Sequence, residues 1–160
     1  MANDKQPPVI LIVDDEEIVT TSLRNLFRLR TDYRTVTYTS PEQALSESNG
    51  HVFDIVISDY LMPGMDGITF LSRFKQVQPQ AIRILLTGYA DKENAILAIN
   101  EVGLYQYVEK PWDNSALLMI VKNAIEKGAL LRTLEEKVRE LQAANASLRD
   151  FQNELIRAFI

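Results

Sequence analysis

The sequence contains no cysteine. This absence excludes disulfide bonds and thiolate metal sites, and it is compatible with the reducing cytoplasm, where we expect the protein to reside. Basic residues are in the minority, and the formal net charge is −5 at pH 7. Several arginines are spread over a predicted helix and the next strand rather than forming a stripe: Arg24, Arg28, Arg30 and Arg34. The charge argues against contact between this segment and nucleic acid.

Long apolar runs are also missing. The first run, residues 9–13 (VILIV), is far shorter than the ~20 apolar residues of a transmembrane helix, and too short for a signal peptide. We therefore expect a soluble protein without membrane association. Residues 1–8 (MANDKQPP) are mostly polar, and Pro7 and Pro8 cannot donate hydrogen bonds to a sheet. We expect a disordered leader there and the first strand from Val9.

The rest of the sequence alternates between apolar, β-branched runs and segments with helical periodicity. The predicted strands cover residues 9–13, 33–38, 53–58, 81–86 and 104–108. The predicted helices cover residues 18–29, 41–48, 68–77 and 91–100, with Asp91 as a cap, and a last helix capped by Asp113 or Asn114. This alternation predicts an α/β fold, a doubly wound five-stranded parallel sheet with helices on both faces.

Four of the five predicted strands end in residue types that carry chemistry. Asp14 and Asp15 follow the first strand, Asp59 the third, Thr87 the fourth and Lys110 the fifth. The carboxyl ends of parallel strands lie on one edge of a sheet, where ligands bind in open α/β folds. We therefore expect these side chains to converge.

The chemistry of such a group points to phosphoryl transfer. Three crowded carboxylates repel one another, and one would take up a proton unless a cation entered. Mg²⁺, or Mn²⁺, prefers such oxygen ligands and would keep Asp59 ionised as a nucleophile that forms an aspartyl-phosphate. Lys110 would neutralise phosphoryl charge, and the Thr87 hydroxyl would donate to a phosphoryl oxygen.

Each residue alone has an ordinary structural explanation. Asp15 could be a helix cap, Thr87 a turn residue and Lys110 a solvated cation. Because all of these residue types follow strand ends in this order, we favour a shared site. An aspartate-nucleophile hydrolase of the haloacid-dehalogenase type is disfavoured, since those enzymes place a D-x-D motif after the first strand, where this chain has Asp14-Asp15-Glu16.

Four motifs carry a resemblance to a known family: Asp14-Asp15, residues 59–67 (DYLMPGMDG), Thr87-Gly88 and residues 107–111 (YVEKP). With them, residues 9–127 resemble the receiver domain of two-component response regulators. The resemblance implies a flavodoxin-like (βα)5 fold. It also implies that Asp59 is the phosphoacceptor.

The resemblance further implies a ligand set for Mg²⁺. Asp15 and Asp59 would bind the ion directly, Asp14 largely through water, and the backbone carbonyl of Leu61 would complete the protein ligands. Thr87, Gly88 and Lys110 would contact the phosphoryl group.

The resemblance also implies how the signal is passed on. Thr87 and Tyr107 would form the switch, and the Lys110–Pro111 peptide would be cis. The output face would include Ile96, Ile99, Asn100, Tyr105, Tyr107 and Trp112, although Trp112 could equally serve packing. Two bulky residues, Leu61 and Tyr89, lie two positions after Asp59 and Thr87. They would flank the path of an attacking water, so we expect slow loss of the phosphoryl group.

The last helix is expected to continue as a coiled-coil linker over residues 128–160. Its seam has the three-four spacing of heptad a and d positions: Leu131, Leu134, Val138, Leu141, Asn145, Leu148 and Leu155. Asn145 lies at an a position, where a buried amide fixes register and favours a parallel dimer. The alternative is a single amphipathic helix packed on its own domain.

Together these features predict a phosphoacceptor module of a response regulator. It would take its phosphoryl group from a sensor histidine kinase or a phosphotransfer protein. It would signal through a homodimeric coil to an output domain outside these residues. Enzymatic activity would be limited to self-phosphorylation and slow autodephosphorylation. A stand-alone relay or scaffold receiver is the alternative.

Overall fold

The computed structural model describes residues 6–159, except for the side chain of Tyr89. Most of the leader expected over residues 1–8 therefore lies outside the described residues. The chain divides into two compact units, residues 1–126 and residues 127–160. Each unit is described by itself.

The first unit is built on a five-stranded, all-parallel sheet with the order β2-β1-β3-β4-β5. The strands are β1 (Val9–Val13), β2 (Arg34–Tyr38), β3 (Ile55–Asp59), β4 (Ile82–Thr87) and β5 (Gln106–Glu109). The order reverses direction next to β1, which pairs with β2 on one side and β3 on the other. This topology confirms the predicted doubly wound, flavodoxin-like receiver fold.

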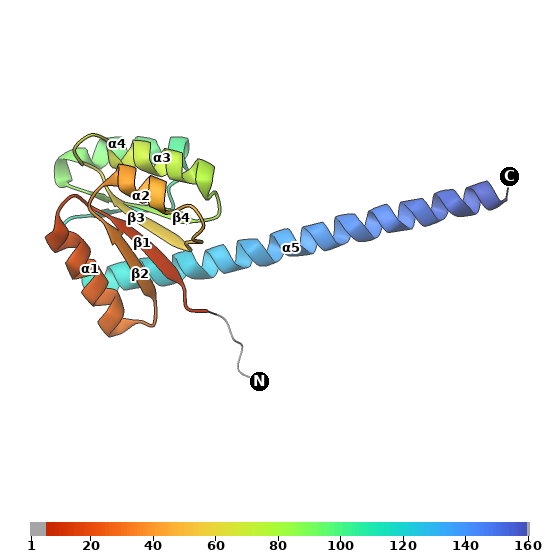
Figure 1. Cartoon of the computed structure of the whole chain (residues 1–160), viewed down its shortest axis with the longest axis horizontal. Helices are drawn as coiled ribbons and strands as arrows, with labels where there is room; N and C mark the ends of the chain where they lie inside the picture. Colours follow the sequence, from red (N-terminus) through yellow and green to blue (C-terminus); the bar gives the residue numbers. More distant parts are fainter. Residues whose placement is uncertain (1–5, 160) are drawn as a thin grey trace. The chain divides into compact units, whose positions relative to one another are not determined.

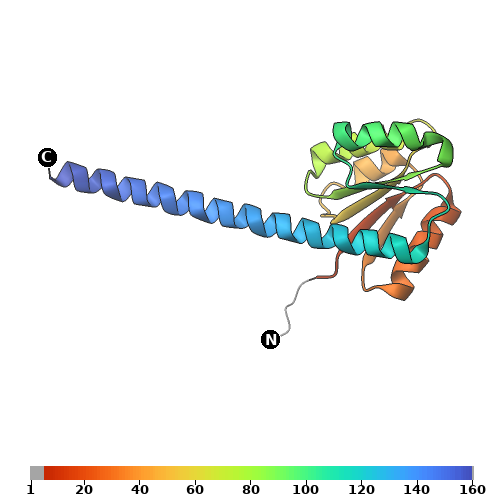
Figure 2. The same cartoon turned by 180° about the vertical axis from the view of Figure 1, so that it is seen from behind.

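Helices cover both faces of the sheet. They are α1 (Glu17–Arg30), α2 (Pro41–Glu47), α3 (Gly67–Val77), α4 (Lys92–Val102) and α5 (Asn114–Ala158). Figure 1 shows α2, α3 and α4 on one face, and α1 with the first turns of α5 on the other. Figure 2 shows the same two layers from behind.

Successive residues of each central strand belong alternately to two separate hydrophobic clusters. In β1, Leu11 and Val13 pack under α2, α3 and α4, whereas Ile10 and Ile12 pack under α1 and α5. Successive side chains of a strand point to opposite faces, so a strand covered on both faces must be apolar throughout. The cores on both faces hold the carboxyl ends of the strands in fixed positions.

Several local boundaries differ from those expected, and the fifth strand begins at Gln106 rather than Leu104. The third strand begins at Ile55 rather than Phe53, because the Phe53 amide donates to the Gln78 side chain, 3.0 Å away, instead of a neighbouring strand. Asp91 occupies the N-cap position of α4, but its side chain makes no capping hydrogen bond. A 3₁₀ turn, η1 (Tyr89–Asp91), precedes α4 there and was not expected.

The second unit is the helical continuation of α5 over residues 127–158. The large apolar side chains of its predicted seam are exposed, from 42% at Leu155 to 65% at Leu141. Among the described residues, no helix is long and apolar enough to cross a membrane. The pairing of this helix with a second chain stays a prediction.

Candidate functional site

The residues predicted to converge do lie at one edge of the sheet. Asp14 follows β1, Asp59 ends β3, Thr87 ends β4, and Lys110 follows β5. The strands are in register there, with Asp59 opposite Leu86 and Thr87 opposite Glu109. Parallel pairing therefore brings together side chains that are up to 96 positions apart in sequence.

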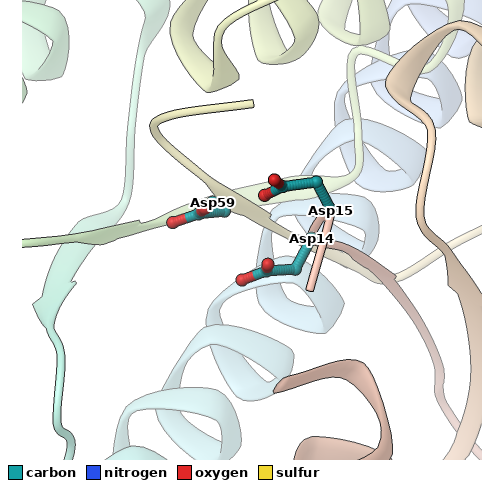
Figure 3. Close-up of side chains that lie close together, drawn as sticks. All are labelled: Asp14, Asp15 and Asp59. Atoms are coloured by element: carbon teal, nitrogen blue, oxygen red, sulfur yellow. The ribbon is translucent and has the colours of Figure 1, made fainter. Parts of the chain in front are cut away.

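Three carboxylates gather at this edge, as Figure 3 shows for Asp14, Asp15 and Asp59. One oxygen of each lies within 4.8 Å of the others. Asp14 is fully buried, Asp59 is 7% exposed, and Asp15 is exposed. This is the oxygen-rich, partly open arrangement that a hard divalent cation prefers.

Lys110 joins the two buried carboxylates. Its Nζ lies 2.8 Å from Oδ2 of Asp14 and 2.9 Å from Oδ1 of Asp59. Its backbone amide donates to the carbonyl of Thr87, 2.8 Å away, which fixes the start of this loop against β4. The following Lys110–Pro111 peptide is cis, as the resemblance to receiver domains implied.

Burial and the neighbouring charges shift the pKa values of Asp59 and Lys110. Burial, followed by the nearby charge of Asp14, raises the pKa of Asp59 above its usual value, although Lys110 partly offsets this. Burial alone would lower the pKa of Lys110, but its hydrogen bonds to Asp14 and Asp59 outweigh that effect and raise it. The site is therefore short of positive charge.

The two aspartates after β1, Asp14 and Asp15, differ in the hydrogen bonds and ion pairs that their side chains make. Asp14 accepts from the Glu16 amide at 2.9 Å through Oδ1 and from Lys110 through Oδ2. Within the described part of the chain, Asp15 makes no hydrogen bond or ion pair. It does not cap α1 either, because the N-cap position belongs to Glu16, which makes no side-chain capping bond. Asp15 is thus the more available ligand.

Thr87 carries an unsatisfied buried group. Its Oγ1 has no hydrogen-bond partner among the described residues, and its side chain is fully buried. A buried hydroxyl without a partner costs free energy, so native proteins seldom keep one without a ligand or a function. An incoming anionic oxygen would supply the missing acceptor, so the donor set of Thr87, Lys110 and the carboxylates fits a phosphoryl group with a divalent cation.

Comparison with known proteins agrees with this geometry. The family model for the response regulator receiver domain matches residues 10–122. The chain belongs to the response regulator receiver family. Receiver domains of this family are regulatory modules of two-component systems.

Among curated proteins, this receiver is similar to the hydrogenase transcriptional regulatory protein HoxA of Cupriavidus necator. The two are 33% identical over 92% of this chain and 30% of HoxA. The transcriptional regulatory protein FixJ of Bradyrhizobium diazoefficiens is 26% identical over 94% of this chain and 73% of FixJ. This chain spans less than a third of the HoxA proteins that it matches.

Among solved structures, the receiver is similar to the signal receiver domain of an HD domain-containing protein from Pseudomonas fluorescens. That match has a TM-score of 0.73 and 37% identity, and it covers 78% of this chain and 98% of the other. A structure described as adenylate cyclase from Rhodopirellula baltica gives a TM-score of 0.78 at 25% identity, over 84% and 98% of the two chains.

Gly67 is a site residue that the sequence analysis did not single out. A Cβ atom at this position would overlap the carbonyl oxygen of Asp59 and would lie 2.9 Å from Cδ1 of Leu85. The Gly67 amide also donates to the carbonyl of Tyr60, 2.7 Å away. The receiver thus needs glycine here so that α3 can begin directly against the Asp59 backbone. The Asp66-Gly67 pair at the start of a helix was the only sequence signal.

The predicted output face of the receiver is divided between the two cores. Tyr107 and Ile99 pack against the cluster under α4, whereas Tyr105 and Trp112 pack against the cluster under α1 and α5. Ile96 and Asn100 are exposed on α4. Trp112 is half-buried and its Nε1 donates to the side chain of Asn114, so it contributes to packing at the start of α5. The cap of α5 is Asp113, whose Oδ1 accepts from the Ala116 amide at 2.8 Å.

The two residues expected to shield the phosphoryl group are only partly described. Leu61 is 62% exposed in the loop after β3. The side chain of Tyr89 lies outside the described residues. Gly88, expected to contact the phosphoryl group, is half-buried and occupies the N-cap position before the η1 turn.

Proposed function

We propose that this receiver takes a phosphoryl group onto Asp59 from a sensor histidine kinase or a phosphotransfer protein. The observation that carries the proposal is the placement of Lys110 between Asp14 and Asp59, close in the fold to the Thr87 hydroxyl, which has no hydrogen-bond partner within residues 6–159. The Asp59 carboxylate, the Lys110 ammonium and the Thr87 hydroxyl lie at one edge of the sheet, and together they could accept a phosphoryl group and stabilise its charge during transfer.

Asp15, Asp59 and the Leu61 carbonyl would hold Mg²⁺ directly, with Asp14 acting through water. When bound, the ion supplies the positive charge that three carboxylates and a phosphoryl group require. Asp59 contributes the attacking oxygen, which forms the new O–P bond as the bond to the donor nitrogen breaks. Lys110 offsets charge on the phosphoryl oxygens, and Thr87 donates to one of them.

The same event would transmit the signal. Drawing the Thr87 hydroxyl toward the phosphoryl group would change the packing beside Tyr107 and shift the face formed by α4, β5 and α5. Residues 131–159 would carry this change as a homodimeric coil to an output domain. A regulatory switch of this kind needs only a few kcal/mol of differential stability between its two states.

A direct test uses a small-molecule phosphodonor in place of the unidentified kinase. Intact-protein mass spectrometry should show one added phosphoryl group with Mg²⁺ present and none with a chelator. Asp59→Asn should stay unmodified, whereas Asp54→Asn, outside the site, should behave like the wild type. Modification of Asp59→Asn to the same extent would refute the proposal.

Sedimentation equilibrium tests the output step. Wild type and Asp59→Asn would be compared with and without Mg²⁺ and beryllofluoride, which mimics a phosphoryl group on a carboxylate. A dimer throughout would place signalling in a rearrangement within the dimer. A dimer formed only with beryllofluoride, and only when Asp59 is present, would make dimerisation the switch. A monomer under all conditions would refute the coil.

A further inference from the structure

The residues of the helix that follows the receiver indicate in which direction a paired helix would run. We propose that residues 131–159 pair with a second copy of this chain in parallel and in register. In that pairing, Phe151 of each copy packs against Ile156 of the other. The inference deepens the proposed function by specifying the dimeric coil, and its test does not depend on phosphorylation.

The seam provides the apolar contact. Within residues 131–159, leucine occupies every d position: Leu134, Leu141, Leu148 and Leu155. All four are exposed in the single chain, by at least 42%. Leucine at d, combined with a β-branched a residue such as Val138, favours two-stranded parallel coils, so the seam fits a second helix of the same kind.

Two polar residues at a positions fix the direction of that helix. Asn145 and Gln152 are exposed and would lie within the seam. In an antiparallel coil an a residue faces a d residue of the partner, and every d residue here is leucine. Each amide would then be buried against leucine without a hydrogen-bond partner, which is costly. In a parallel, in-register coil, each amide meets its own copy and can pair with it.

The same residues exclude a shifted parallel register. A shift of one heptad brings Asn145 opposite Gln152 at one layer. It also leaves the other Asn145 opposite Val138 and the other Gln152 opposite Phe159. Only the in-register alignment pairs both amides.

Flanking residues give an independent indication of direction. Phe151 lies at a g position and Ile156 at an e position, and they are 57% and 58% exposed in the single chain. In parallel coils, g of one helix faces the following e of the other. A parallel dimer therefore contains the Phe151–Ile156 contact twice, once on each side of the seam, and covers both side chains of each chain.

The other g–e contacts of the parallel alignment contain no pair of like charges. They join Leu130 to Glu135, Lys137 to Gln142 and Ala144 to Arg149. Charge therefore does not oppose this alignment, and the apolar Phe151–Ile156 contact is its main flanking feature.

The absence of native cysteine permits a clean cross-linking test in the full chain. Leu131→Cys, at an a position, and Leu155→Cys, at a d position, would be placed about 36 Å apart along the helix, at ~1.5 Å per residue. One variant carries a size tag, and the two are refolded separately and as a mixture before mild oxidation. Ala143→Cys, at an outward f position, is the matched control.

The parallel, in-register coil predicts that each of the two seam variants forms disulfide-linked homodimers. Mixed oxidation should give no product that links the Leu131→Cys chain to the Leu155→Cys chain, and the control should stay largely unlinked. Mixed products without homodimers would establish an antiparallel pair and overturn the inference. No cross-linking in any variant would also overturn it, while leaving phosphoryl transfer to Asp59 unaffected.

The Phe151–Ile156 contact is tested by the sign of a double-mutant cycle. Phe151→Glu and Ile156→Lys should each weaken dimerisation about tenfold, since each removes a buried apolar group. Together they should weaken it less than the product of the two effects, because Glu and Lys would face each other across the parallel seam. A double variant weakened by the full product of the two effects, or by more, would mean that the two side chains do not meet across the seam, and would contradict the inference.

Discussion

The ammonium of Lys110 lies 2.9 Å from the Oδ1 atom of Asp59. The proposed nucleophile is therefore held in an ion pair whose partner residues come from β3 and from the loop after β5. Lys110 also reaches Asp14, so removing it would leave two buried carboxylates without their cation. This dependence has a measurable consequence for folding.

Lys110→Met should lower the free energy of unfolding at pH 7 by about 3 kcal/mol, because breaking a buried ion pair leaves uncompensated charge. The loss should shrink as pH falls and the carboxylates become protonated in the folded protein. Urea unfolding between pH 7 and pH 4, without divalent cations, measures it. Lys137→Met, which removes only an exposed pair with Glu140, is the control and should change little. Equal losses in the two variants would contradict the arrangement.

Asp59→Asn should stabilise the domain at pH 7 when no divalent cation is present. Burial raises the pKa of Asp59 in the folded state above its usual value of 3.8, so the folded protein binds more protons than the unfolded chain above that pH. Stability therefore falls as pH rises through the interval between the two pKa values, and Asn removes this loss.

Thermal unfolding in chelator should show the higher melting temperature of Asp59→Asn at pH 7 and a smaller difference near pH 4. Adding Mg²⁺ should raise the melting temperature of the wild type but not that of Asp59→Asn, which has lost one carboxylate of the ligand set. Asp113→Asn, at the cap of α5, is a control for loss of one negative charge. A lower melting temperature for Asp59→Asn in chelator would contradict the prediction.

Thr87→Val should leave the unmodified domain as stable as the wild type, or more stable by about 1 kcal/mol. The substitution keeps the shape of the side chain and removes a buried hydroxyl that has no partner in the described part of the chain. The same variant should lose most of its affinity for beryllofluoride with Mg²⁺, because the donor to the phosphoryl oxygen is gone.

Thr87→Ser is the matched control, since it keeps the hydroxyl and loses the methyl group. It should be less stable than the wild type and should keep its response to beryllofluoride. Calorimetric titration together with urea unfolding separates the two properties. Wild-type affinity in Thr87→Val would show that this hydroxyl does not contact the phosphoryl group.

Gly67→Ala should destabilise the domain by about 1–3 kcal/mol or more, the range for overpacking a filled site. The added methyl group would meet the Asp59 backbone, which cannot move away without shifting β3 or α3. Gly88→Ala is the comparison, because its Cβ would lie 3.5 Å from its nearest neighbour, an ordinary contact. Equal midpoints for the two variants in urea would refute this explanation of Gly67.

Leu61 should slow the loss of phosphate from Asp59. Its bulky side chain lies in the loop after β3, where we propose that it hinders an attacking water. Leu61→Ala should therefore lose phosphate several-fold faster than the wild type, measured as phosphate release from purified phosphoprotein. A wild-type half-life of seconds, or an unchanged rate in the variant, would contradict this role.

The strand ends could be deduced from sequence because their signals are local. The buried run before Asp59 and the turn after it fix the end of β3, and parallel topology brings Asp14, Thr87 and Lys110 to the same edge. The role of Gly67 could not be deduced, since the approach of α3 to the Asp59 carbonyl exists only after packing.

Helix boundaries show the same limit. The Asp91 side chain was expected to cap α4 directly, but the chain instead forms the η1 turn before Lys92. Aspartate favours caps and turns alike, so the sequence did not distinguish them. The start of β3 likewise depended on Gln78, which is 25 residues from Phe53 and invisible to local patterns.

The most direct test of the account identifies the residue that carries the phosphoryl group. The protein would be phosphorylated by a small-molecule donor with Mg²⁺ and then reduced with borohydride, which converts an aspartyl-phosphate to homoserine. Peptide mass spectrometry should find homoserine at position 59 and at no other aspartate. Homoserine at Asp14 or Asp15, or none at position 59 in protein shown to be phosphorylated, would contradict the assignment of Asp59 as the phosphoacceptor.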